Sequence, residues 1–293
     1  DHSYITTFPG EKLDHEYDLC VTDVCPVGAM TAKYFRFQKR VWLLSHTPTI
    51  SMDDALGANI WLDHADGRIY RVMPRCNPVV NRSWLSNTSR LAFQNFQKDR
   101  LPAMGLHVIS DALKNGKIAI VVGGSCTIED LTAAKMLKDS LGGNAEIFGG
   151  TFKKVNTPDG IAMSGDPLAN RNGMKLLGIN DNGVEELLKR ASEFKVLLTV
   201  NADLFGEDAS KAKALEMIPT RIAISAFNDL TAQKATLAFG IRHWSEVQGT
   251  MLNVNNILQK LNAAPVCPDE KLRPAYQVLS ELAGSAFESA LDA

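Results

Sequence analysis

The residues best suited to redox chemistry lie in the stretch CVTDVCPVGAMT, residues 20–31. Cys25 precedes a proline, as the last cluster ligand does in many iron–sulfur proteins, and Gly28 permits a tight turn beside it. A [4Fe-4S] cluster is normally held by four thiolates, yet Cys20 and Cys25 are spaced C-x4-C and no C-x2-C-x2-C occurs in the chain. From these residues alone, a cluster ligand and a structural Cys-Pro turn are equally good interpretations of Cys25.

A second candidate for chemistry is Cys126, in the stretch VVGGSCT between an apolar run and a helical pattern. The start of a helix lowers the pKa of a thiol, so one hypothesis is a small α/β enzyme with Cys126 as its nucleophile. The alternative, which we favour, is a tight turn with a small residue packed in it. Neither G-x-G-x-x-G nor G-x-x-x-x-G-K-[ST] occurs, and the six histidines are never spaced as a helical metal-binding pair.

The composition is that of an ordinary globular chain, with 293 residues of which 45% are hydrophobic and 22% charged. A formal net charge of −2 gives no sign of a polyanion-binding protein, so nucleic acid is not expected as a partner. No apolar run approaches the roughly 18 residues of a membrane-spanning helix, so direct membrane insertion is not expected. Five scattered cysteines, an odd number, argue against a disulfide framework and fit a reducing compartment.

The elements that must position these residues follow from apolar runs of strand length that alternate with helical patterns over residues 103–252. This alternation predicts an α/β fold with a parallel sheet in three layers. Residues 46–102 are predicted to form a small β-rich unit whose hairpin turns at Asp66-Gly67. Residues 1–45 are expected to be an irregular segment ending in a strand, KYFRFQKRVWLL, and residues 253–293 a helical tail in two pieces. The parallel strands are expected at residues 117–124, 145–150, 195–203, 220–227 and 235–241.

Residues 23–44, DVCPVGAMTAKYFRFQKRVWLL, resemble a segment of the large iron–sulfur subunit of NADH–quinone oxidoreductase, respiratory complex I. Residues 54–93 resemble the start of that family's molybdopterin-oxidoreductase-like region, and residues 166–179 and 245–265 resemble later segments. The resemblance implies that residues 1–45 end an iron–sulfur domain. It also implies that the α/β region is a shortened molybdopterin-oxidoreductase-like domain, and that the chain corresponds to the C-terminal portion of the family layout.

By the same resemblance, Cys25 is the fourth ligand of a [4Fe-4S] cluster, with the other ligands upstream or on a partner chain. The family also carries a [2Fe-2S] cluster and a second [4Fe-4S] cluster upstream, and Cys20 has no counterpart in it. Some bacterial relatives bind a further cluster through cysteines at the place of residues 51–60. Here Asp53 and Asp54 stand without a cysteine, so that cluster is expected to be absent, and no recognisable ligand for molybdenum is found.

The function implied by the resemblance is that of an electron-transfer subunit, which relays electrons from an NADH-oxidising flavoprotein through iron–sulfur clusters toward quinone. The implied partners are that flavoprotein and the quinone-side subunits of the peripheral arm, and no independent active site is expected on this chain. The implied location is peripheral, on the cytoplasmic or the matrix side of the respiratory membrane. Two alternatives stay open: a non-redox scaffold of the same complex, and the equivalent subunit of an NAD-linked hydrogenase or formate dehydrogenase.

Overall fold

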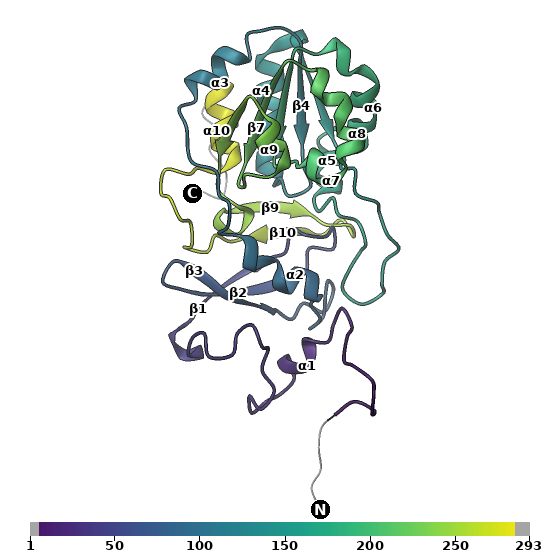
Figure 1. Cartoon of the computed structure of the whole chain (residues 1–293), viewed down its shortest axis with the longest axis vertical. Coiled ribbons are helices and arrows are strands. Elements are labelled where there is room, and N and C mark those ends of the chain that lie inside the picture. The colour runs from purple at the N-terminus through teal and green to yellow at the C-terminus, as the bar shows by residue number, and fades with distance from the viewer. Residues whose placement is uncertain (1–5, 285–293) are drawn as a thin grey trace, which may run out of the picture.

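The computed structural model describes residues 6–284, and its central element is a five-stranded parallel sheet (Figure 1). The strands run along the sheet in the order β5-β4-β6-β7-β8, and each falls within an apolar run predicted as a strand. The prediction of a parallel α/β sheet is therefore confirmed. The bounds are β4 (Ile118–Val122), β5 (Ala145–Gly149), β6 (Val196–Val200), β7 (Thr220–Ser225) and β8 (Leu237–Gly240).

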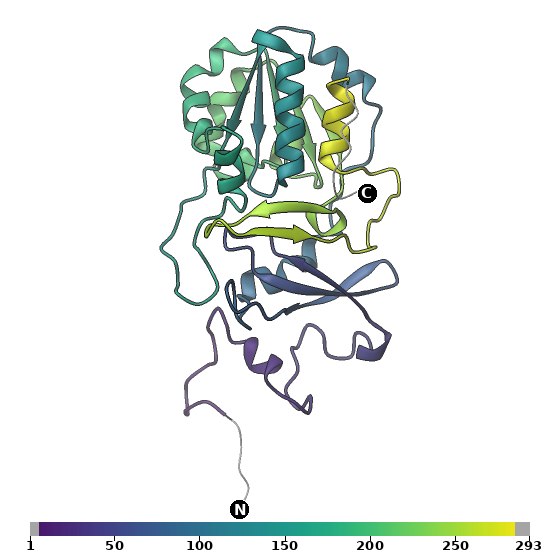
Figure 2. The same cartoon turned by 180° about the vertical axis from the view of Figure 1, so that it is seen from behind.

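Helices cover both faces of this sheet, which confirms the prediction of three layers (Figures 1 and 2). Within β4, Ile118, Ile120 and Val122 face one helical layer. Ala119 and Val121 face the other, and all five side chains are buried, as expected for a strand covered on both sides. One layer holds α3 (His107–Ala112), α4 (Ile128–Ser140) and α10 (Ala275–Leu282), and the other holds α6 (Gly183–Arg190), α7 (Leu204–Glu207) and α8 (Ala209–Ala212).

A three-stranded antiparallel sheet lies below the α/β region in Figure 1 and contains β1 (Ser45–Ile50), β2 (Asn59–Ala65) and β3 (Arg68–Pro74). Asp66 and Gly67, which join β2 to β3, have φ of 51° and 72°. Two consecutive positive φ values are those of a type I′ turn, so the predicted hairpin at Asp66-Gly67 is confirmed. The remaining helices are short: α1 (Cys20–Asp23), α2 (Asn87–Leu91), α5 (Arg171–Leu176) and α9 (Leu230–Lys234).

A second hairpin, β9 (Gly249–Leu252) with β10 (Leu258–Leu261), lies between the small sheet and the α/β region (Figures 1 and 2). Met251 and Leu261 share one hydrophobic core with side chains of the small sheet. The prediction of a helix at the start of the tail is therefore wrong, because residues 258–261 alternate exposed and buried and pair with β9. The later part of the tail contains α10 as predicted, and residues 285–293 lie outside the described residues.

The predicted strand over residues 33–44 is also wrong. This segment forms turns and a short 3-10 helix at Val41–Leu43. Alternating residue types make a strand only where another strand can pair with them, and no strand pairs with this segment in the part of the chain described. Phe37 has φ of 64° and is 91% exposed, which no strand residue would show. Within residues 6–284, no helix combines the length and apolar character needed to cross a membrane.

His243 lies at the junction of the two regions, enclosed by aromatic rings. Its ring centroid is 4.2 Å from that of Phe96, and its Nδ1 is 2.9 Å from the Ser245 hydroxyl. Burial, and then the charge of Arg100, hold the pKa of His243 well below its ordinary range. Below about pH 6.5 the unfolded chain therefore binds a proton that the folded chain does not, so acidification favours unfolding.

Replacing His243 with glutamine is expected to weaken this acid sensitivity. The free energy of unfolding should fall less steeply with decreasing pH in the variant, by up to about 1.4 kcal/mol per pH unit. Urea unfolding between about pH 7 and pH 5 measures the difference, and the cost of the substitution should shrink toward the acid end. An equal cost at every pH would show that His243 stays neutral in both states or is protonated in both.

Candidate functional site

Cys25 lies in a surface loop that follows α1, near the N-terminal end of the described chain. The backbone N–H of Met30 donates to the Cys25 sulfur at 3.4 Å, so the loop folds back over its own thiol. Gly28 makes this possible with φ of +67°, a conformation that residues with a side chain rarely adopt. The sequence prediction of a tight turn beside Cys25 is confirmed.

The loop favours the thiolate form of Cys25. The N–H of Met30, and then those of Val27, Ala29 and Gly28, lower the pKa of this thiol below its usual value. A thiolate is the form in which cysteine binds iron, and N–H groups around a ligand sulfur tune the metal that it holds. The local chemistry therefore fits a metal ligand, and it also fits a reactive thiol.

The segment that carries Cys25 is fixed to the rest of the molecule by contacts far apart in sequence. The backbone N–H of Asn87 donates to the Glu16 carbonyl at 2.6 Å, and the N–H of Thr88 donates to the Glu16 carboxylate at 2.7 Å. The Tyr17 hydroxyl donates to Asp159 and accepts from the N–H of Ala162. The start of the chain is thus attached both to α2 and to the long loop that follows β5.

The structure does not bring another cysteine of the sequence into a ligand set with Cys25. Cys20 is buried and its thiol donates to the Leu85 carbonyl at 3.3 Å, in agreement with the interpretation of a packed thiol. Cys76 is exposed, and Cys267 donates to the Asp269 carbonyl. Within residues 6–284, no group of three or more His, Cys, Asp or Glu residues could hold a metal ion. The described chain offers Cys25 as a single ligand.

Cys126 does not have the properties of a nucleophile. Its side chain is fully buried, its thiol donates to the Val200 carbonyl at 3.4 Å, and burial raises its pKa well above the usual value. The favoured interpretation, a tight turn, is confirmed by Gly124, where an added Cβ would lie 2.9 Å from the Leu168 Cα. The crevice beyond the carboxyl ends of parallel strands often binds ligands, but here the chain itself packs against the turn.

Asp54 has a structural role at the place where some relatives of the proposed family bind a further cluster. Its buried carboxylate accepts the N–H groups of Ser164 and Gly165, each at 2.9 Å, and that of Leu56 at 2.8 Å. The adjacent Asp53 accepts from the Ser51 hydroxyl, and burial raises the Asp53 pKa to about 6. These acids tie the loop after β5 to the small sheet; the absence of that cluster stays a prediction.

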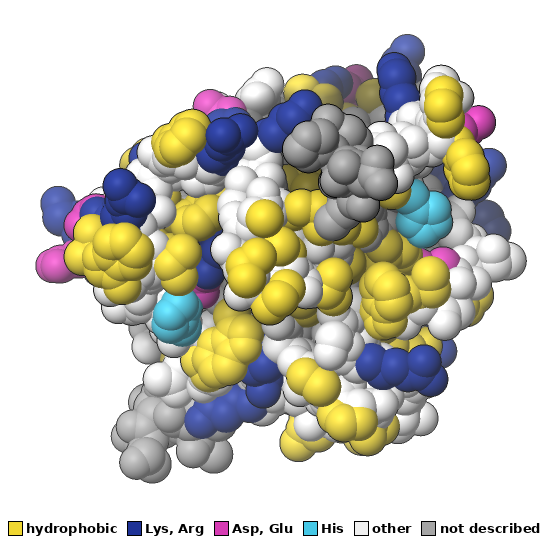
Figure 3. All heavy atoms as spheres, turned by 90° about the horizontal axis from the view of Figure 1, so that it is seen from below, with side chains coloured by type: hydrophobic (Ala, Val, Ile, Leu, Met, Phe, Trp, Pro, Cys, Tyr) yellow, Lys and Arg dark blue, Asp and Glu magenta, His cyan; other side chains and the backbone are white. Residues whose placement is uncertain are grey.

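The face of the molecule at the N-terminal end carries many hydrophobic side chains with cations among them (Figure 3). Phe37 is the most exposed of these large side chains, and Val24, Val27 and Trp42 are each more than three-quarters exposed. The guanidinium of Arg40 lies 5.6 Å from the Trp42 ring. A patch of this kind is typical of a surface that another protein covers, and the Cys25 loop lies within it.

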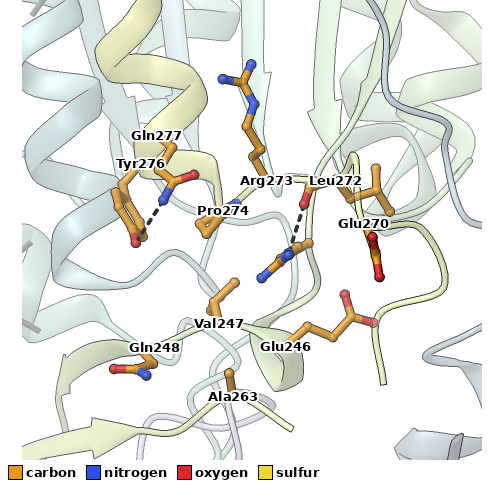
Figure 4. A pocket seen from close by; sticks show the side chains of 11 residues that line it. Glu246, Val247, Gln248, Ala263, Glu270, Leu272, Arg273, Pro274, Tyr276 and Gln277 are labelled. Carbon is orange, nitrogen blue, oxygen red and sulfur yellow. Dashed lines mark hydrogen bonds between the residues drawn. The ribbon is translucent and has the colours of Figure 1, made fainter. Parts of the chain in front are cut away.

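A separate hollow of about 260 Å³ lies between α10 and the β9–β10 hairpin (Figure 4). Its polar groups hold segments of the chain together: the Arg242 Nε donates to the Leu272 carbonyl at 2.8 Å. Glu246, also in the lining, forms a buried ion pair with Arg100 at 2.6 Å. No residue of the Cys25 loop lines this hollow, and these polar groups are matched within the chain.

Comparison with known proteins gives one family match. The sequence profile of a family described as "NADH-ubiquinone oxidoreductase NDSU1/NuoG-like, 4Fe-4S domain" matches residues 44–94, which form the small sheet and α2. These residues begin 19 positions after Cys25 and contain a single cysteine, Cys76. The matched residues alone therefore cannot supply the four thiolates of a cluster.

Curated relatives carry related names. A NADH-quinone oxidoreductase protein of Rickettsia felis, the G-type chain of that enzyme, is 31% identical over 162 residues, which cover 49% of this chain and 24% of the relative. The 75 kDa subunit of NADH-ubiquinone oxidoreductase from Reclinomonas americana is 37% identical over 97 residues, 33% of this chain and 14% of the relative. An iron-sulfur protein 1 of mitochondrial NADH dehydrogenase from Solanum tuberosum is 30% identical over 153 residues, 47% of this chain and 21% of the relative.

The chain thus spans about a quarter or less of the length of these relatives. The sequence-based recognition of the family is supported both by the profile match and by the names of the relatives. The likeness of residues 103–252 to a molybdopterin-oxidoreductase domain stays a prediction. Over about half of its length, the chain is a relative of the large iron–sulfur subunit of NADH–quinone oxidoreductase, the type that includes the 75 kDa subunit.

Proposed function

We propose that this chain takes part in electron transfer in an NADH–quinone oxidoreductase and that Cys25 is one ligand of a [4Fe-4S] cluster. The observation that carries the proposal is the Cys25 loop, in which backbone N–H groups favour a thiolate. The name of the matching family, a 4Fe-4S domain, supports the same cofactor. When bound, the cluster would supply one-electron chemistry, and the remaining ligands would come from outside the described residues.

The chain's own contribution is to hold and tune. Cys25 would bind iron as a thiolate, and the N–H of Met30 would stabilise charge on its sulfur. Cys126, the one nucleophile that the sequence suggested for the α/β region, is buried and protonated. We therefore propose a docking and positioning role for that region.

The partners proposed are other subunits of the same enzyme. The relatives are named as subunits of NADH–quinone or NADH–ubiquinone oxidoreductase, and the exposed apolar face around Val27 and Phe37 fits coverage by protein. We propose the NADH-oxidising flavoprotein on one side of the relay and the quinone-side subunits of the peripheral arm on the other. The proposed location is peripheral, on the cytoplasmic or matrix side of the membrane.

Alkylation of the cysteines in the intact enzyme tests the proposal. With a cluster bound, Cys25 should resist iodoacetamide under anaerobic conditions, because its sulfur is bonded to iron. After the clusters are removed oxidatively, Cys25 should react readily, since its pKa is lowered and the side chain reaches the surface. Cys76 is exposed and serves as the reference thiol that reacts in both samples. Peptide mass spectrometry reports each site.

The same experiment separates the proposal from its rival. A non-redox scaffold would keep Cys25 as a free thiol, reactive before and after the cluster-removing treatment. If Cys25 were shielded only by a neighbouring subunit, it would stay unreactive after the clusters are removed and become reactive after the subunits are dissociated. Either result would overturn the assignment of Cys25 as a ligand.

A further inference from the structure

Arg90 is a buried cation beneath the segment that carries Cys25. Its side chain is 1% exposed, and it projects from the short helix α2 of the family-matched region. Its guanidinium binds both carboxylate oxygens of Asp23, with one of the two contacts at 3.0 Å. It also donates to the Val72 carbonyl of β3 at 3.3 Å. Arg90 therefore joins the small sheet to α1, which ends two residues before Cys25.

The same guanidinium contacts the chain on both sides of the Cys25 loop. On the N-terminal side it binds Asp23 and lies 3.7 Å from the Cys20 sulfur. On the C-terminal side it interacts with the side chain of Tyr34, which is hydrogen-bonded to it. The intervening residues 24–33 are mostly exposed. One buried group thus fixes both ends of a loop whose middle projects into solvent.

A second contact supports the C-terminal end of the loop. The guanidinium of Arg71, on β3, lies 4.6 Å from the ring of Phe35, and Arg71 is itself paired with Asp63. Arg71 contacts the loop at one end only. Removing it would leave α1 attached through Asp23, whereas removing Arg90 would release both ends.

From this arrangement we infer that Arg90 is a positioning residue for Cys25. The Arg90–Asp23 pair sets where the Cys25 thiolate stands on the surface and holds the turn in which the N–H of Met30 reaches the sulfur. The pair also places one positive and one negative charge near the proposed cluster. That electrostatic part rests on the proposed function, whereas the positioning of the thiol does not.

The positioning role is tested without iron, on the full-length protein. In the wild type, the pH midpoint of Cys25 alkylation should lie below the ordinary cysteine value of about 8.5. In Arg90→Gln, release of the loop should remove the N–H donors from the sulfur and raise this midpoint toward about 8.5. Arg90→Lys keeps the charge but lacks the two-pronged donor, so it should raise the midpoint as well and also covers the case in which the glutamine variant does not fold.

Arg100→Gln is the matched control. Arg100 is also buried and paired with a carboxylate, Glu246, but its partners Phe96, Ala226 and Ile241 are all outside the Cys25 segment. This variant should lose stability and leave the Cys25 midpoint unchanged. An unchanged midpoint in the folded Arg90 variants, or an equal rise in Arg100→Gln, would overturn the positioning role.

The charges are tested by redox titration of the intact enzyme, followed by EPR. Arg90→Gln leaves Asp23 unpaired and should make the cluster harder to reduce, whereas Asp23→Asn leaves Arg90 unpaired and should make it easier to reduce. Shifts of opposite sign would not arise from simple loosening, which would disturb both variants alike. If both potentials stay at the wild-type value with the cluster present, the electrostatic part fails; if Cys25 proves not to be a ligand, the proposed function fails instead.

Discussion

Replacing Cys25 with alanine is expected to remove one [4Fe-4S] signal from the EPR spectrum of the assembled enzyme. Alanine offers no ligand, and a cluster with an open iron site is easily lost. Electron transfer from NADH to quinone should fall by at least about tenfold, since even changes beside metal ligands cost roughly 10–100-fold. The fold should persist, because the Cys25 sulfur is bonded only within its own loop.

Cys20→Ala is the control for this experiment. Cys20 lies five positions away, and its buried thiol donates to the Leu85 carbonyl and lies beside Arg90. Its loss should cost about 1 kcal/mol of stability and leave every cluster signal in place. If Cys25→Ala keeps all signals of the wild-type enzyme, or if Cys20→Ala removes the same one, the ligand has been assigned to the wrong residue.

The α/β region was predictable because its signals are local. Each parallel strand is a short, nearly continuous apolar run, since helices cover both faces and no position needs to be polar. The helix α4 carries its own start signal, with Thr127 and Asp130 capping each other's backbone N–H groups. Signals of this kind are complete within a dozen residues, and the structure agrees with them.

The wrong predictions concern segments whose structure depends on distant partners. Residues 258–261 have the alternation of a strand, but so short a pattern is also compatible with a helix, and only pairing with Gly249–Leu252 decides between them. Residues 33–44 alternate just as clearly and still form no strand, since nothing pairs with them among residues 6–284. Pairing is a property of the fold and is not written in the segment.

The candidate site divides in the same way. Cys25 and Gly28 could be picked out because proline, glycine and cysteine together restrict what a short loop can do. Arg90 could not be picked out, because its partner Asp23 lies 67 positions earlier and neither residue stands in a motif. Its importance comes from burial, which makes an unpaired charge costly and so fixes the two segments together.

The second large effect concerns Gly123, at the carboxyl end of β4. An added Cβ would lie 1.8 Å from the Asn201 carbonyl oxygen and 3.1 Å from the Ala202 Cα. Both are backbone atoms beyond β6, and the Gly123 N–H is itself bonded to the Val200 carbonyl at 2.9 Å. Gly123→Ala is therefore expected to separate β4 from β6 at this end of the sheet and to lower the free energy of unfolding by about 3 kcal/mol or more.

Gly143→Ala provides the comparison, because an added Cβ there would meet nothing within 4 Å and the backbone needs no positive φ. Urea unfolding of both variants should show a large loss for Gly123→Ala and a change within about 0.5 kcal/mol for Gly143→Ala. Equal, small effects would mean that the ends of β4 and β6 can move apart at little cost. The crevice between them would then be able to open for a ligand, which the close packing of Gly123 and Gly124 now rules out.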